Sequence, residues 1–207
     1  MDRRTLLATG GAAFALGITT PRLIMAQEAD NEFGIMDMVQ GSADAPVEMI
    51  EYASYTCPHC ARFHADTYPE LKADYIDSGK VRFVYREVYF DRFGLWASMV
   101  ARCGGQEKFF GITDLIYEKQ REWTESGDPA IIAEELNKIG LMAGLDAETL
   151  DACMSDGEMA QNLVDWYRAN AERDDVSSTP SFLIDGQKYS NMAYADLKAI
   201  LDDKIGA

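Results

Sequence analysis

The chain has 207 residues, of which 47% are hydrophobic and 11% are aromatic. This composition is typical of a globular protein with one or two domains and a sizeable core, and it argues against a disordered chain. Lys and Arg number 19 against 35 Asp and Glu, which gives a net charge of −16 at pH 7. So acidic a chain repels phosphate backbones, and we exclude a nucleic-acid partner. The acidity favours a soluble, self-repelling surface over one that selects basic partners.

The first 26 residues differ from the rest of the chain. Arg3 and Arg4 precede an apolar run over residues 5–20 that glycines interrupt, and the segment closes on Ala26. This pattern predicts a secretory signal peptide over residues 1–26 that is cleaved near Ala26. A membrane anchor is the alternative, but the run is shorter than the roughly 18 residues that a spanning helix needs. The arginine pair also fits the twin-arginine route of export.

Residues 27–46 form a lead-in without a clear pattern, and a predicted strand follows over residues 47–55. Its sequence, VEMIEYASY, runs almost directly into the C-P-H-C motif of residues 57–60. β-branched and aromatic residues favour a strand, and a proline in the first turn favours the start of a helix. We therefore expect a strand, a short turn and a helix, with the motif at the N-terminus of the helix.

The helix after the motif is expected to kink at Pro69 and to end at Gly79. Its apolar positions recur at helical spacing, at Phe63, Tyr68, Leu71, Tyr75 and Ile76. Residues 81–90 (VRFVYREVYF) predict a second strand. The resulting β-α-β unit places its two strands parallel through a right-handed crossover. Such a sheet needs helices on both faces.

The remainder of the chain predicts a helical insertion and then a return to the sheet. Amphipathic runs within residues 94–173, one of them over residues 108–122, indicate about four or five helices and no strand. Residues 181–184 and 187–190 predict two strands joined by a turn at residues 185–186, and residues 193–205 predict a closing helix. The fold class is therefore α/β, laid out as β-α-β, an all-helical insertion and β-β-α.

Two cysteines separated by two residues at a helix N-terminus favour redox chemistry. The unpaired N–H groups and the positive dipole end of the helix stabilise the thiolate of the first cysteine, Cys57. Cys60 is close enough to attack a mixed disulfide at Cys57 and is expected to be the more buried of the two. Pro58 suits the first helical turn, and His59 supplies a positive charge or an extra donor that favours the Cys57 thiolate.

A lone C-x-x-C also occurs in zinc sites and in structural disulfides. Cys57, Cys60 and His64 together offer soft ligands for Cu(I) or Zn. However, the chain has two histidines and no second C-x-x-C to complete a tetrahedron. We therefore favour redox chemistry, expect no metal, and expect His64 on the helix surface. A redox-inert binding module with a structural Cys57–Cys60 bond is the third interpretation.

Thr179-Pro180 opens a late strand, a position where a cis peptide bond occurs. The segment EYASYTCPHC, a helical insertion, and STPSFLIDG before a hairpin and a last helix together resemble the DsbA family of periplasmic thiol oxidases over residues 45–205. The resemblance implies a thioredoxin-like fold built from residues 47–93 and 174–207, with residues 94–173 as an inserted helical domain. It also implies a cis Thr179-Pro180 bond beside the cysteine pair.

The resemblance assigns roles to further residues. Cys57 is the attacking thiolate and Cys60 the resolving partner, and the backbone at Thr179 pairs with an extended substrate peptide. Glu51, six positions before the first cysteine, is the buried acid beneath the active site that accepts a proton. Because Glu51 interrupts an apolar strand that is covered on both sides, burial is favoured over a solvent-facing position. A partner charge from Arg86 stays open.

Cys103 and Cys153 both fall in the helical insertion, 50 positions apart. Four cysteines permit three pairings, and the resemblance assigns Cys57 and Cys60 to each other. We expect Cys103 and Cys153 to form a structural disulfide, worth about 4 kcal/mol on the chain-entropy estimate. A second redox centre and two buried free thiols are the alternatives.

The resemblance implies an exported, monomeric enzyme of the periplasm that introduces disulfide bonds into newly exported proteins with cysteine thiols. A membrane protein that passes electrons to quinone would reoxidise it, and no organic cofactor is implied. A disulfide isomerase or reductase of the same fold is the alternative, because Thr179 before the proline is common to all three activities. An isomerase needs a dimerisation module, for which residues 27–46 are short.

Overall fold

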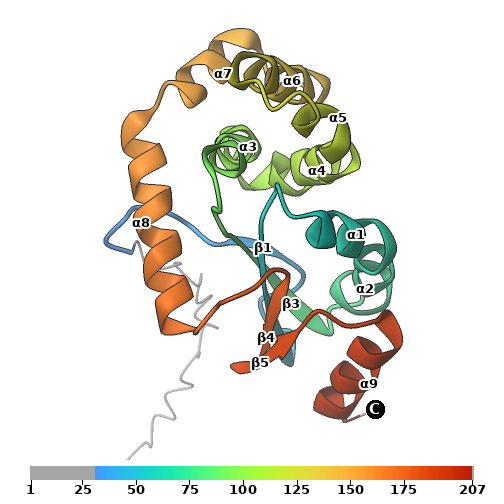
Figure 1. The fold of residues 1–207 in the computed structure, drawn as a ribbon. Helices are drawn as coiled ribbons and strands as arrows, with labels where there is room; N and C mark the ends of the chain where they lie inside the picture. The colour runs from blue at the N-terminus through green and yellow to red at the C-terminus, as the bar shows by residue number, and fades with distance from the viewer. Residues whose placement is uncertain (1–30, 207) are drawn as a thin grey trace, which may run out of the picture.

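The computed structural model describes residues 31–206. The expected signal peptide, residues 1–26, lies outside the described residues. Five strands form one mixed sheet in the order β1-β3-β2-β4-β5 (Figure 1). The strands are β1 Met38–Gln40, β2 Val47–Ala53, β3 Val81–Glu87, β4 Ser181–Ile184 and β5 Gln187–Ser190.

The pairing of the strands confirms the predicted β-α-β and β-β-α units. β2 and β3 are parallel, with Glu51 opposite Tyr85. β4 lies antiparallel to both β2 and β5. β2 and β3 are each shorter than predicted, since they end at Ala53 and Glu87. The lead-in also contributes a strand that its sequence did not indicate, because β1 pairs antiparallel with β3.

Helices cover both faces of the sheet, and the alternation along β2 decides which residues face which helices. Ile50 and Tyr52 pack with Tyr167 on the face of α8, Gly157–Arg173. Met49 and Ala53 belong to the larger core on the opposite face. That face carries α1 Pro58–Asp66, α2 Tyr68–Leu71 and α9 Tyr194–Ile205 (Figure 1).

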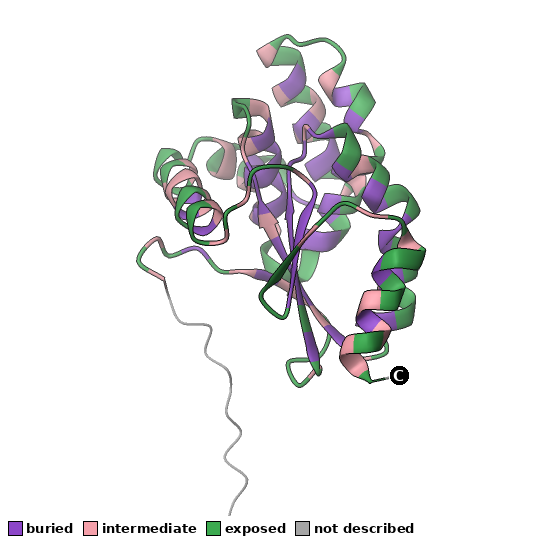
Figure 2. Ribbon diagram, turned by 60° about the horizontal axis from the view of Figure 1, so that its bottom comes forward, coloured by how far each residue is buried: buried purple, intermediate pink, exposed green. Residues whose placement is uncertain are grey.

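Successive side chains of a strand point to opposite faces of the sheet, so Glu51 lies on the same face as Met49 and Ala53, beneath α1. The central strands β2, β3 and β4 are mostly buried, whereas β5 at the edge is largely exposed (Figure 2). A charged residue at this position of β2 therefore needs a partner from the helices that cover it.

The helix after the C-P-H-C motif is divided near the predicted kink. α1 ends at Asp66, Pro69 lies in the first turn of α2, and a π-helical turn η1, Lys72–Ile76, follows. Gly79 then adopts φ 74°, a left-handed conformation that favours glycine and ends the helical run as expected.

Between β3 and β4 the chain forms six helices, one more than the upper expectation. The predicted run over residues 108–122 is divided at Lys119 into α4 and α5. The side chains of Asp91, Asp128, Asp146 and Asp156 accept hydrogen bonds from backbone N–H groups at four of the helix starts. The bounds are α3 Arg92–Cys103, α4 Gly105–Glu118, α5 Gln120–Thr124, α6 Pro129–Met142, α7 Ala147–Met154 and α8 Gly157–Arg173.

A disulfide joins two of these helices. Cys103 at the end of α3 is bonded to Cys153 in α7, with an S–S distance of 2.11 Å. Cys57 and Cys60 are free thiols. The structure therefore shows the expected structural pair and the dithiol form of the C-P-H-C motif.

Two arginines form ion pairs that connect the sheet to neighbouring segments. On the α8 face, Arg86 forms a bidentate ion pair with Asp37 of the lead-in and a 3.3 Å contact with Asp174 at the end of α8. Tyr52 donates to the same Asp174 carboxylate. Arg86 is therefore engaged away from Glu51, and the partner charge left open for that carboxylate does not come from it.

The second arginine, Arg102 of α3, is buried against the end of β3. Its Nε and Nη2 atoms lie 2.6 Å and 2.7 Å from the two carboxylate oxygens of Glu87, and Ser98 donates to the same carboxylate. The pair fixes the start of the helical insertion to the sheet. Among residues 31–206, no helix has the length and apolar character that crossing a membrane requires.

Candidate active site

Cys57 occupies the position immediately before α1, where helix N–H groups have no intrahelical acceptor. It has extended backbone angles, and Pro58 begins the helix. The Cys57 side chain is 8% exposed and Cys60 is fully buried, in agreement with the expected order. Pro58 and His59 are exposed. The sequence therefore produces one reachable thiol at the start of a helix and one thiol enclosed one turn later.

The surroundings of Cys57 stabilise its thiolate. The pKa of Cys57 is lowered to about 5, and the largest cause is a hydrogen bond from Cys60. Burial opposes this shift, while hydrogen bonds from the Thr179 side chain and from the backbone of Cys60 and His59 add to it. The contribution shown for His59 thus comes from its backbone N–H. Cys57 is therefore largely ionised at neutral pH.

Cys60 has the opposite environment. Burial raises the pKa of Cys60 far above its ordinary value, and the hydrogen bond to Cys57 and the negative charge of Glu51 raise it further. The two thiols of one motif therefore differ strongly in acidity. A proton that Cys60 gains or loses has to be exchanged with groups inside the core.

The Thr179-Pro180 peptide bond is cis, as expected, and lies beside Cys57. In the protonated form, the Cys57 thiol donates to the carbonyl oxygen of Thr179 at 3.5 Å. Pro180 is buried and Thr179 is partly exposed. The backbone at Thr179 thus borders the reactive sulfur where a polypeptide could approach.

Glu51 is fully buried, which agrees with the expectation, and its partner is His64. The Oε2 atom of Glu51 lies 3.1 Å from Nε2 of His64. The expectation that His64 lies on the helix surface is wrong, since this residue is 7% exposed. The error has a simple reason: His64 lies one helical turn after Cys60, on the side of α1 that faces β2, so its ring meets the carboxylate.

The imidazole of His64 is held between aromatic rings. It stacks on Tyr68 and Tyr117, with ring centroids 4.7 Å and 4.3 Å away, and Tyr85 meets it edge-on at 5.8 Å. Even so, Oε1 of Glu51 and Nδ1 of His64 find no hydrogen-bond partner among the described residues. The pair is thus fixed in position while one polar atom of each residue is unused.

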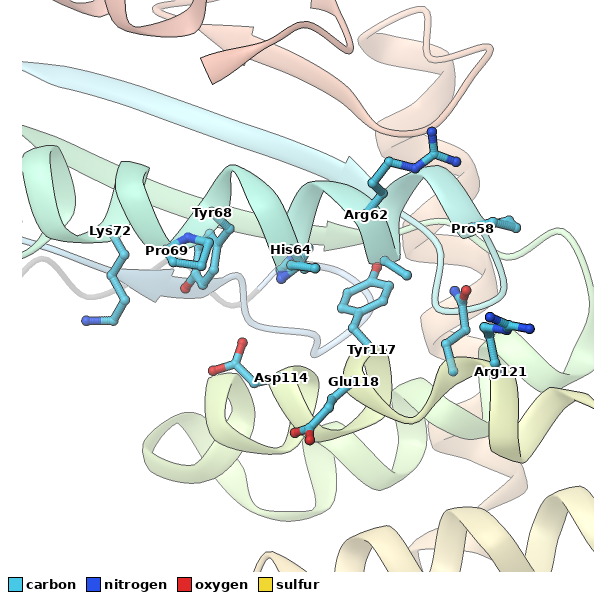
Figure 3. A pocket seen from close by; sticks show the side chains of 13 residues that line it. Pro58, Arg62, His64, Tyr68, Pro69, Lys72, Asp114, Tyr117, Glu118 and Arg121 are labelled. Carbon is cyan, nitrogen blue, oxygen red and sulfur yellow. The ribbon is translucent and has the colours of Figure 1, made fainter. Parts of the chain in front are cut away.

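A pocket of about 740 Å³ opens beside this pair (Figure 3). His64, Tyr68 and Tyr117 belong to its wall, and Pro58 and Arg121 border it near the start of α1, while Lys72 and Asp114 lie toward its other end. The residues that line the pocket belong to α1, α2 and η1 on one side and to α4 and α5 on the other. The pocket therefore lies on the side of α1 that faces the helical insertion.

Gln120 of α5 is a site residue that the sequence did not reveal. Its Nε2 atom donates to the carbonyl oxygens of Tyr55 and Cys57, at 2.8 Å and 2.9 Å. Gln120 is buried and lies 63 positions from Cys57 along the chain. No local motif marks it, and only the packing of the insertion onto the turn before α1 brings it there.

The alternative of a metal site gains no support from the side chains. In residues 31–206 there is no group of three or more His, Cys, Asp or Glu side chains that could hold a metal ion. The Nε2 atom of His64 is directed to Glu51. Cys57, Cys60 and His64 do not form the ligand set considered from the sequence.

The fold and this site define a thioredoxin-like protein with a helical insertion. A family model described as "Thioredoxin" matches residues 34–203. The chain belongs to the thioredoxin family.

Within this family, the chain is similar to disulfide-bond proteins. It is 34% identical to a "Putative protein-disulfide oxidoreductase" of Rickettsia bellii over 82% of this chain and 64% of that protein. It is 27% identical to "Disulfide bond formation protein D" of Bacillus subtilis over 81% of this chain and 76% of that protein. The chain thus spans slightly less than two thirds of the Rickettsia relative.

The solved structures agree with these relatives. The crystal structure of Wolbachia pipientis alpha-DsbA1 matches with a TM-score of 0.75 and 25% identity, over 82% of this chain and 91% of that chain. The resemblance to DsbA proteins that the motifs indicated is therefore confirmed.

Proposed function

We propose that this chain is an exported thiol-disulfide oxidoreductase that introduces disulfide bonds into newly exported proteins. The observation that carries the proposal is the contrast between its two thiols: Cys57 has a pKa lowered to about 5, and Cys60 is fully buried with a raised pKa. A stabilised Cys57 thiolate favours the reduced protein, which makes the Cys57–Cys60 disulfide a strong acceptor of electrons.

The reaction follows from this contrast. A substrate thiolate attacks Cys57 of the oxidised protein, a bond forms between the substrate sulfur and Cys57, and Cys60 leaves and takes up a proton. A second substrate thiolate then attacks the substrate sulfur of this mixed disulfide, and Cys57 leaves as its stabilised thiolate. The substrate gains a disulfide, and the protein ends as the dithiol. Glu51, which is fully buried, is the proposed acid that exchanges the Cys60 proton.

The backbone at Thr179 is proposed to hold the substrate. It borders the sulfur of Cys57 through its carbonyl oxygen. Backbone pairing of this kind reads little sequence, so unfolded or partly folded proteins with cysteine thiols are the proposed clients. Pro180 keeps this backbone beside the sulfur, and Pro58 and His59 border it from the exposed start of α1.

Export and reoxidation complete the proposal. The apolar, glycine-interrupted segment of residues 1–26 supports export to the periplasm, by the general or the twin-arginine route. A membrane protein that passes electrons to quinone is the proposed oxidant for the dithiol. We propose that the chain acts as a monomer without an organic cofactor.

The direction of the reaction is tested by equilibrating the Cys57–Cys60 pair with glutathione buffers of known ratio. A potential well above about −180 mV is expected for an oxidase. Thermal unfolding of both redox forms is expected to show that the reduced form is the more stable. A potential near or below about −230 mV would instead identify a reductase. For the isomerase alternative, the test is refolding of a protein with scrambled disulfides.

A further inference from the structure

The buried pair of Glu51 and His64 leads from the resolving cysteine toward the pocket beside α1. We propose that His64 conducts the Cys60 proton between Glu51 and the water of this pocket. The inference deepens the proposed function and rests on it, because it concerns the proton that Cys60 exchanges in each turnover. His64 is assigned as a positioning and proton-conducting residue that acts through Glu51.

The first step is the need for a route. Cys60 is fully buried, and so is Glu51, so bulk water does not reach either group directly. When a substrate thiolate opens the Cys57–Cys60 disulfide, the sulfur of Cys60 leaves with an electron pair and binds one proton. Until reoxidation releases the proton from Cys60 again, a carboxylate that has given it up can regain a proton only from water.

The second step is the geometry of the pair. Nε2 of His64 lies 3.1 Å from Oε2 of Glu51, within hydrogen-bond distance. An imidazole can take a proton at one ring nitrogen and release it at the other. The other nitrogen, Nδ1, is itself buried and has no hydrogen-bond partner in the described part of the chain. His64 forms part of the pocket wall (Figure 3), so a small movement of the ring or of its neighbours brings Nδ1 to the water of the pocket.

The third step is the separation of the two routes around α1. Cys57 contacts Thr179 on the substrate side, whereas the pocket wall is built from α1, α2, α4 and α5. Thr179 does not line the pocket, and the two sides meet only near Pro58, so a substrate peptide bound at Thr179 need not fill the pocket beside His64. The proton therefore has a path that stays available while the mixed disulfide exists.

The charged groups near His64 are compatible with this path. Glu51 faces it from β2, and Asp114 of α4 interacts with it electrostatically at the pocket. Burial holds the pKa values of the surrounding Tyr68, Tyr85 and Tyr117 above the ordinary range, so these hydroxyls stay neutral. The remaining charged side chains of the pocket are Arg62, Lys72, Glu118 and Arg121.

A packing role alone does not account for His64. The stack between Tyr68 and Tyr117 needs only a flat ring, which phenylalanine supplies without polar atoms. A buried ring nitrogen without a partner costs about 1–3 kcal/mol. The hydrogen bond to Glu51 accounts for Nε2, and exchange with water in the adjoining pocket is the role proposed for Nδ1.

The experiment measures the rate at which reduced glutathione opens the Cys57–Cys60 disulfide under single-turnover conditions from pH 5 to pH 9. His64→Gln keeps a polar partner for Glu51 without a second ring nitrogen, and His64→Phe keeps the stacked ring. Both are expected to slow the step at least about 10-fold, as the loss of a proton-transfer group does. Alkylation of the Cys57 thiolate in the reduced protein is expected to keep its wild-type rate.

Chemical rescue separates proton transfer from structure. In His64→Ala, added imidazole is expected to enter the pocket and restore the rate several-fold, while the wild-type rate stays unchanged. Asp66→Asn, at the exposed end of the same helix, is the matched control and is expected to behave as wild type. If His64→Ala does not fold, the pH profiles of the Gln and Phe variants decide.

Rates within twofold of wild type across the pH range in the Gln and Phe variants would overturn the role of His64. So would a slow His64→Ala that imidazole fails to accelerate. These results are independent of the glutathione equilibrium. A low potential of the Cys57–Cys60 pair, together with slow disulfide opening in the His64 variants, would reject the oxidase function. It would still support the proton path through His64.

Discussion

The Nε2 atom of Gln120 donates a 2.9 Å hydrogen bond to the carbonyl oxygen of Cys57. The same atom donates to the carbonyl oxygen of Tyr55, so one side chain of the helical insertion holds both ends of the turn before α1. The insertion is therefore part of the site as well as a cover for it.

Replacement of Gln120 by Leu is expected to destabilise the protein by about 2–4 kcal/mol. The carbonyl oxygens of Tyr55 and Cys57 each lose a donor in this variant, and a buried polar group without a partner costs about 1–3 kcal/mol. The Cys57 oxygen still accepts a hydrogen bond from the backbone N–H of Ala61. Urea unfolding measures the loss. Gln161→Leu, at an exposed position of α8, is the control and is expected to change stability by less than about 0.5 kcal/mol. Equal losses of stability in the two variants would show that the hydrogen bonds of Gln120 do not hold the turn before α1.

The reactivity of Cys57 is expected to titrate near pH 5. Iodoacetamide alkylation of the reduced protein should follow the thiolate, whose pKa is lowered to about 5 by hydrogen bonds from Cys60 and Thr179. Because the folded pKa is below the unfolded value, the resulting stability of the reduced form is fully present above about pH 9. It declines as the pH falls and is lost as the pH passes through about 5. An alkylation midpoint near pH 8 would contradict the assignment.

Thr179→Val tests one cause of that pKa. The variant keeps the shape of the side chain and removes its hydroxyl, so the alkylation midpoint is expected to rise by about one unit or less. One unit corresponds to a potential lower by about 30 mV. Ser178→Ala, whose hydroxyl interacts with Ser181, is the control and is expected to leave the midpoint in place.

Replacement of both Cys103 and Cys153 by Ala is expected to cost about 4 kcal/mol of stability, because the loop of 50 positions is no longer closed in the unfolded chain. The potential of the Cys57–Cys60 pair is expected to stay the same. Urea unfolding and glutathione equilibration of the same variant measure the two quantities. A shift in the potential of more than about 30 mV would point to a redox role for the second pair.

Arg102→Met is expected to destabilise the fold by about 3–5 kcal/mol, since it leaves the buried carboxylate of Glu87 without its partner. Lys138→Met breaks an exposed ion pair with Glu134 and is expected to have no measurable effect. An equal loss of stability in the two variants would show that the buried ion pair of Arg102 and Glu87 is not its cause.

The sequence predicted those parts of the fold that follow from local patterns. The strands, the start of α1 and the hairpin all depend on residue type and spacing within about ten positions. β1 was missed because three residues at a sheet edge carry too little pattern. The division of one predicted helix at Lys119 was missed because residues 108–122 read as one amphipathic run.

The site was predicted only where a motif marks it. The roles of Cys57 and Cys60 follow from a helix N-terminus, which the sequence locates. His64 was misplaced because its partner lies on another element: the burial of Glu51 on the α1 face decides the environment of the residue above it. Gln120 was missed because its hydrogen bonds are to backbone atoms, which no residue pattern specifies.

The contacts of Arg86 on the α8 face influence the position of the backbone beside the sulfur of Cys57. Residues 174–180 form a short strap between α8 and β4. Arg86 and Tyr52 hold its first residue, Asp174, and the pairing of Ser181 with Tyr52 in the sheet holds its far end. Both ends of this strap are held by residues of adjacent strands, so its backbone has little freedom to move. Contacts on the α8 face of the sheet therefore help to set the distance between Thr179 and Cys57. Replacement of Asp37, which pairs with Arg86 on that face, is therefore expected to change the surroundings of the Cys57 thiol.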